Sequence, residues 1–155
     1  MTDDLPQLLP RIYAALDEHR FDDLAGYYTP TVRAVTPGGV LAGHEALIAQ
    51  ATRNHAGIPA IQHLVTGLLI DDDDEGGADL RANVVAVFAG EDRVPTFELG
   101  GVWRGRAQRD ARGWRIAEFT ITPTWTRGTR PAATTAPDDE GPERSPVPAL
   151  RDATG

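Results

Sequence analysis

The 155-residue chain contains neither cysteine nor lysine. Without cysteine it has no disulfides, no thiolate metal ligands and no cysteine nucleophile. Without lysine, a Schiff-base mechanism and a Walker-type phosphate loop are excluded, because both need the lysine amine. The chain also lacks an apolar run of the roughly 18 residues that a membrane-spanning helix needs. Its first residues, MTDDLPQLLPR, lack the basic region and apolar core of a signal peptide. We therefore predict a cytoplasmic protein with no membrane partner.

The charge is unbalanced: the net charge is -8, and all 15 strong cations are arginine. Affinity for a phosphate backbone comes largely from lysine and arginine, so we predict no nucleic-acid partner. The acids DDDDE at 71–75 precede Gly-Gly and lack the alternating ligands of a calcium loop, which favours a solvated hairpin turn. His19, His44 and His55 stand at polar helix ends without zinc-ligand spacing. We therefore predict neither a metal site nor any other cofactor.

Hydrophobic periodicity changes from helical to strand-like near the middle of the chain. Helices are predicted at 5–18, 21–28 and 44–55, a short strand at 31–35, and long strands at 60–71, 79–90, 95–108 and 113–125. Helices followed by an antiparallel run of strands indicate an α+β domain, which we assign to residues 1–127. Residues 128–155 hold five prolines and no aromatic residue, so we predict a disordered, Pro/Ala-rich acidic tail.

Three stretches carry a resemblance to a known family: ALDEHRFDDLAGYYTPTVRA (15–34), IQHLVTG (61–67) and GVWRGRAQRDARGWRIAEFTITPTW (101–125). They resemble the SnoaL-like and scytalone dehydratase-like branch of the nuclear transport factor 2-like superfamily. The resemblance covers roughly residues 5–127 and implies a cone-shaped barrel, in which three N-terminal helices pack on a strongly curved mixed or antiparallel sheet. It also implies a homodimer through the open sheet face, or else a trimer.

The resemblance places Asp17 on the position of the dehydratase's helical aspartate and His63 on that of its pocket histidine. The two tyrosines of that pattern are replaced by Leu16 and Thr36, and its second histidine has no counterpart in VVAVFAG (84–90). The resemblance therefore implies that the acid–base pair is present, while the tyrosines that would orient a carbonyl are absent.

Each member of this pair has two interpretations. Asp17 either shares a helix face with Tyr13, four residues earlier, or belongs to the solvated DEHR end of the helix. His63 alternates with Val65, Gly67 and Leu69 on one strand face. A histidine on an apolar face needs a hydrogen-bond partner. An aspartate there makes it either an acid–base dyad or a buried histidine paired with a structural carboxylate.

We expect the dyad to face a mainly apolar pocket of about 300–1,000 Å³, the usual size of a ligand site. The nominated lining residues are Tyr13, Tyr28, Val35, Phe97 and Trp103, with Asn83 donating to a substrate oxygen. For each of them, ordinary core packing is the alternative.

These residues favour a small cofactor-independent enzyme, in which Asp17 polarises His63 and His63 moves a proton. The resemblance implies dehydration, isomerisation or cyclisation of an apolar, oxygenated small molecule (polyketide-, steroid- or terpenoid-like), as in secondary metabolism. One alternative is a non-catalytic small-molecule-binding or dimerisation module of the same fold. Another is an epoxide hydrolase-like activity, which needs an Asp–Arg–Asp relay around a water, with Arg81 or Arg104 as its arginine.

Overall fold

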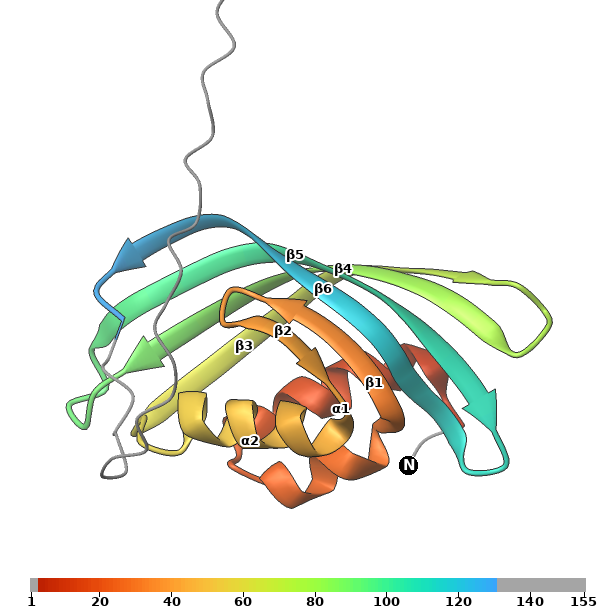
Figure 1. Cartoon of the computed structure of the whole chain (residues 1–155). Coiled ribbons are helices and arrows are strands. Elements are labelled where there is room, and N and C mark those ends of the chain that lie inside the picture. Colours follow the sequence, from red (N-terminus) through yellow and green to blue (C-terminus); the bar gives the residue numbers. More distant parts are fainter. Residues whose placement is uncertain (1–2, 131–155) are drawn as a thin grey trace, which may run out of the picture.

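The computed structural model describes residues 3–130, in which two α-helices, one 3-10 helix and six strands follow one another (Figure 1). The elements are α1 (Leu5–Asp17), η1 (Phe21–Gly26), β1 (Tyr28–Thr36), β2 (Gly39–Ala42), α2 (His44–His55), β3 (Ala60–Asp72), β4 (Gly77–Ala89), β5 (Pro95–Asp110) and β6 (Gly113–Gly128). Strand β6 runs to Gly128, one residue beyond the predicted domain end. The rest of the predicted tail, from residue 131 onward, lies outside the described residues.

The six strands form one mixed sheet in the order β2-β1-β6-β5-β4-β3. Strands β1 and β6 pair in parallel, and the other neighbours pair antiparallel. The sheet curves over the helices, which all lie on its concave side (Figure 1). The predicted α+β fold with a curved mixed sheet is confirmed. The second predicted helix is a short 3-10 segment, and β2 was not predicted because a four-residue edge strand carries little periodic signal.

Helix α1 is amphipathic and lies against β3. Leu8, Leu9 and Ile12 are almost fully buried, and the helix continues through Pro10. The hydrogen bond that Pro10 cannot make would reach Pro6, which is exposed in the first turn, so water can satisfy that carbonyl. Among residues 3–130, neither helix has the length and apolar character needed to cross a bilayer. Because α1 packs against β3, its last residue, Asp17, lies beside the sheet.

Strand β3 changes face at a bulge between Thr66 and Leu69. Gly67 adopts a φ of 58° there, which glycine accepts without the steric cost of a Cβ. Before the bulge Val65 packs against the core. After it Leu68 does so, and Leu69 is 60% exposed. The prediction that Gly67 and Leu69 continue the face of His63 was therefore wrong, because one extra residue inverts the alternation of side chains.

The acidic run completes β3 with Asp71 and Asp72 and then forms the predicted turn to β4. The Asp73 carboxylate accepts hydrogen bonds from the backbone N–H groups of Glu75 and Gly77, each at 2.9 Å. It also pairs with Arg106 on β5. These bonds, the backbone ones first, lower the pKa of Asp73. The acids therefore shape a surface turn rather than a ligand site.

Candidate functional site

Asp17 and His63 meet where the end of α1 contacts β3. Asp17 Oδ1 lies 2.5 Å from His63 Nδ1, and Asp17 Oδ2 accepts the backbone N–H of His63 at 2.9 Å. The His63 side chain is 5% exposed and that of Asp17 21%. Both carboxylate oxygens are thus engaged by one residue, which holds the imidazole in one orientation. The interpretation of Asp17 as a solvated helix end is wrong.

This contact also determines which ring nitrogen of His63 is available. A carboxylate only accepts hydrogen bonds, so the hydrogen between the two groups belongs to Nδ1. In the neutral imidazole, Nε2 then carries a lone pair. Within residues 3–130, Nε2 has no hydrogen-bond partner of its own, and His63 lines a cavity. The geometry leaves one basic nitrogen free at that cavity.

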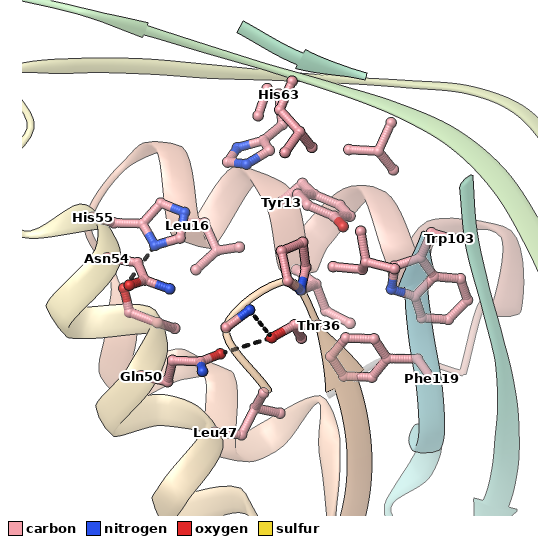
Figure 2. Close-up of a pocket in the computed structure, with 18 of the residues that line it drawn as sticks. Tyr13, Leu16, Thr36, Leu47, Gln50, Asn54, His55, His63, Trp103 and Phe119 are labelled. Atoms are coloured by element: carbon pink, nitrogen blue, oxygen red, sulfur yellow. Dashed lines mark hydrogen bonds between the residues drawn. The ribbon is translucent and has the colours of Figure 1, made fainter. Parts of the chain in front are cut away.

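The cavity lies between the helices and the concave face of the sheet and has a volume of about 150 Å³ (Figure 2). Tyr13, Tyr28, Phe97 and Trp103 line it. Most of its other walls are apolar: Ile12, Leu16, Leu24, Leu47, Val84, Ala86, Phe88, Leu99, Phe119 and Ile121. It is smaller than expected because aromatic rings fill much of the cone. Trp103 stacks on Phe119 with ring centroids 5.5 Å apart, and Tyr28 lies 5.9 Å from the same ring.

Two tyrosines contribute the cavity's phenolic groups. The Tyr13 ring lies 4.8 Å from that of His63. Burial raises the pKa of Tyr13 well above its ordinary value, and Tyr28 and Asp17 add to the shift. Burial likewise raises the pKa of Tyr28. Both hydroxyls therefore stay protonated at neutral pH and act as hydrogen-bond donors.

A second histidine lines the cavity, and the sequence analysis missed it. His55, the last residue of α2, lies 5.7 Å from His63 between ring centroids (Figure 2). Its pKa is lowered to about 4, mainly by burial and in addition by His63 and Arg130, while a hydrogen bond to Ala51 and the charge of Asp17 oppose the shift. The polar sequence around His55 suggested an exposed helix end. The useful signal was its spacing of eight residues from the buried Leu47, which places both on one helix face.

The mouth of the cavity is polar. Gln50 and Asn54 of α2 face the turn after β1, where Thr36 Oγ1 donates to Gln50 Oε1 at 3.2 Å (Figure 2). The backbone N–H of Gly38 in turn donates to Thr36 Oγ1 at 3.2 Å.

Despite the two histidines beside Asp17, no group of three potential ligands among His, Asp and Glu is arranged for a metal ion within residues 3–130.

Two nominated residues do not reach the cavity. Val35 is 46% exposed, and Asn83 is exposed between the inward-facing Ala82 and Val84. Side chains alternate along a strand, so both residues point to the outer face of the sheet. Arg81 and Arg104 also border a hollow on that outer face, which excludes them from a relay in the His63 cavity. Successive side chains of a strand point to opposite faces of the sheet. A prediction that is one residue out of register therefore assigns side chains to the wrong face.

Comparisons with known proteins agree with this architecture. A family model described as SnoaL-like domain matches residues 2–120. No curated protein matches the chain. Among solved structures, the chain is similar to a scytalone dehydratase candidate from Novosphingobium aromaticivorans, at 16% identity over 88% of this chain and 93% of that one, with a TM-score of 0.73.

Two further structures share the fold. A hexachlorocyclohexane dehydrochlorinase is 13% identical over 86% of this chain and 91% of its own, with a TM-score of 0.71. The Kfla4162 protein from Kribbella flavida is 19% identical over 79% and 89%, with a TM-score of 0.71. These structural likenesses show the fold, and the family model spans most of the chain. The chain therefore belongs to the SnoaL-like domain family.

Proposed function

We propose that this protein is a cofactor-independent enzyme, in which His63, oriented by Asp17, removes a proton from a carbon beside a carbonyl group. The observation that carries this proposal is the double contact between Asp17 and His63. In the neutral imidazole this contact leaves the lone pair on Nε2 of a residue that lines the apolar cavity, and it keeps a carboxylate in place for the imidazolium that forms. Asp17 is the positioning residue and His63 the base.

The proton balance is the same in each reaction that we consider. The C–H proton moves to His63 Nε2, and negative charge develops on the carbonyl oxygen. Tyr13 supports this step because its protonated hydroxyl can donate to that oxygen. In isomerisation, His63 returns the proton to another carbon. In dehydration, the C–O bond breaks and the departing hydroxide takes the proton back from His63 to form water, which leaves His63 neutral again. In cyclisation, the carbanion attacks a second carbonyl carbon of the same molecule, the C=O π bond opens to an alkoxide, and His63 returns the proton to that oxygen.

The size of the cavity limits the substrate. A dry cavity of about 150 Å³ accommodates benzene in another protein, so the volume here favours one ring over a steroid. A small aromatic or cyclic compound, or the reacting ring of a polyketide- or terpenoid-like molecule in secondary metabolism, suits this space. The names of two structural relatives, a dehydratase and a dehydrochlorinase, describe eliminations. An elimination also involves the loss of a proton next to a leaving group.

Two ring ketones test this function and separate two of the reactions. 3-Cyclohexenone tests isomerisation and 3-hydroxycyclohexanone tests dehydration. Both give 2-cyclohexenone, whose conjugated absorbance is followed in the ultraviolet. We expect His63→Gln to lower kcat/KM by about 10²–10⁴-fold, the usual contribution of a general base. Asp17→Asn is expected to lower it strongly as well, because an amide can favour the wrong imidazole tautomer.

Asn83→Ala is the matched control, because Asn83 faces away from the cavity and its loss should not change the rate. Full activity in either dyad variant contradicts the proposed mechanism. A wild-type protein that converts neither ketone faster than buffer also contradicts it. Stabilisation by these ketones without turnover supports the alternative of a non-catalytic small-molecule-binding module.

We further propose a homodimer formed through the outer face of the sheet. This face exposes apolar side chains, among them Val40 at 69% and Leu69 at 60%, and it also carries arginines and acids from several strands. A two-fold interface can pair such opposite charges with each other while it buries the apolar groups. Light scattering after size exclusion should report a dimer, and Leu69→Arg should give a monomer. A trimer or a wild-type monomer contradicts this assembly.

A further inference from the structure

Three aromatic rings lie close to His55, and the charges of Asp17 and Arg130 also act on it. Its ring lies 6.5 Å from Phe21, 6.1 Å from Phe88 and 5.7 Å from His63, measured between centroids. Among residues 3–130, its side chain makes one hydrogen bond, to the backbone of its own helix at Ala51. The ring is therefore held mainly by aromatic neighbours at the wall of the cavity, where a ligand can reach it.

The free nitrogen of His55 is a hydrogen-bond acceptor. Its Nδ1 lies 2.6 Å from the carbonyl oxygen of Ala51, and a carbonyl only accepts, so the proton sits on Nδ1. Burial, which lowers the pKa of His55 to about 4, keeps the ring neutral at pH 7. Nε2 then carries a lone pair. No hydrogen bond to it occurs within residues 3–130, and Figure 2 shows this nitrogen on the side of the ring away from α2.

We propose that His55 selects substrates that carry a hydroxyl group, which donates a hydrogen bond to His55 Nε2 while His63 acts on a carbon of the same molecule. The inference rests on the proposed function and names the substrate class of that site: a compact, one-ring ketone that carries a hydroxyl group in addition to any leaving group. A buried acceptor without a donor is unfavourable. A hydroxylated ligand can donate to this acceptor and remove that cost in free energy, whereas a hydrocarbon cannot.

The same geometry assigns different roles to the two histidines. His63 has a carboxylate partner for the charge that proton uptake creates, whereas the hydrogen bond of the His55 side chain within the described part of the chain is to a neutral carbonyl. His55 is therefore a binding group rather than the base. A hydrogen bond accepted from a hydroxyl also does not help that hydroxyl to depart. The group held by His55 thus stays on the substrate, and any leaving group is a different substituent.

Phenol and toluene test the inference directly, because they have nearly the same shape and differ in the donor. Isothermal titration gives the ratio of their affinities for the wild type and for two variants. His55→Asn keeps an amide N–H where Nδ1 donates to Ala51, but places no atom at Nε2. His55→Gln restores an acceptor oxygen near the Nε2 position. We expect His55→Asn to lower the affinity for phenol relative to toluene by about tenfold, the upper range for one hydrogen bond. His55→Gln should restore part of this preference.

A second readout detects the bond itself. In a ¹⁵N spectrum of the histidine rings, phenol should shift the His55 Nε2 resonance upfield, while toluene should leave it in place. A purely structural role for His55 predicts no such selective shift. The wild type titrated with toluene provides the matched reference for ring-current effects.

Three outcomes overturn the inference. The phenol-to-toluene ratio stays the same in His55→Asn; or it falls in His63→Gln alone, so that His63 holds the hydroxyl; or the wild type binds neither probe at millimolar concentration. The binding ratio does not depend on turnover. If His55→Asn keeps its phenol preference while His63→Gln abolishes enone formation, the substrate class is wrong and the enzymatic proposal stands. The opposite pair of results leaves a hydroxyl-binding cavity without the proposed catalysis.

Discussion

Mild acid should destabilise this protein through one identifiable side chain, His55. Burial lowers its pKa from the ordinary 6.5 to about 4 in the folded state. Between these two values the unfolded chain binds more protons than the folded one, so stability falls as the pH falls. The contribution is fully present above pH 6.5 and is lost toward pH 4. With these pKa values, proton linkage removes about 2 kcal/mol between pH 7 and pH 5.

Urea unfolding of the wild type and of His55→Asn at both pH values measures this effect. The other titrating groups are common to both proteins, so the difference between their pH-induced changes isolates His55. We expect the wild type to lose about 2 kcal/mol more than the variant. An NMR titration of the ring should report the pKa of His55 directly, in an environment that also contains His63, Asp17 and Arg130.

Two results would refute this reasoning. Equal pH dependence in the wild type and in His55→Asn means that the folded and unfolded states protonate His55 equally. A ring titration near 6.5 means that water solvates the imidazole as it does in an open chain. Either result also means that a fraction of His55 is protonated at pH 7, and that only the remaining neutral fraction can accept a hydrogen bond at Nε2.

Other predictions concern the core, the bulge and the outer face. Leu8→Ala should cost about 2–5 kcal/mol in urea unfolding, because Leu8 is fully buried. Gly67→Ala should cost about 1–2 kcal/mol at a φ of 58°, and Gly67→Asn should cost less, because asparagine tolerates this conformation. Val35→Ala should leave kcat/KM for either ring ketone within about twofold of wild type, and a larger loss would mean that the outer face contributes to the site.

The positions of most elements followed from periodicity and turn chemistry. Both α-helices and the four long strands were predicted, with ends displaced by up to three residues at β6 and two at β4 and β5. Edge strand β2 was missed because it is short. The acidic run was recognised as a turn, because consecutive carboxylates before two glycines fit that role better than a ligand loop.

The site was predicted unevenly, for reasons that individual residues show. The family resemblance related Asp17 to His63, and the model brings them together across 46 positions of sequence. Tyr13, Tyr28, Phe97 and Trp103 were nominated and line the cavity. Val35 and Asn83 were nominated and do not, because both positions point to the opposite side of their strands.

Composition and local pattern alone determined the elements, the acidic turn, and the exclusion of cysteine and lysine chemistry, because these depend on residue type and near neighbours. Only the tertiary structure decided that His55 faces His63, that the aromatic rings leave about 150 Å³, and that β3 inverts its face at Gly67. These features arise where segments distant in sequence pack together. At such places, a shift of one residue in the strand register changes which side chains point into the same cavity.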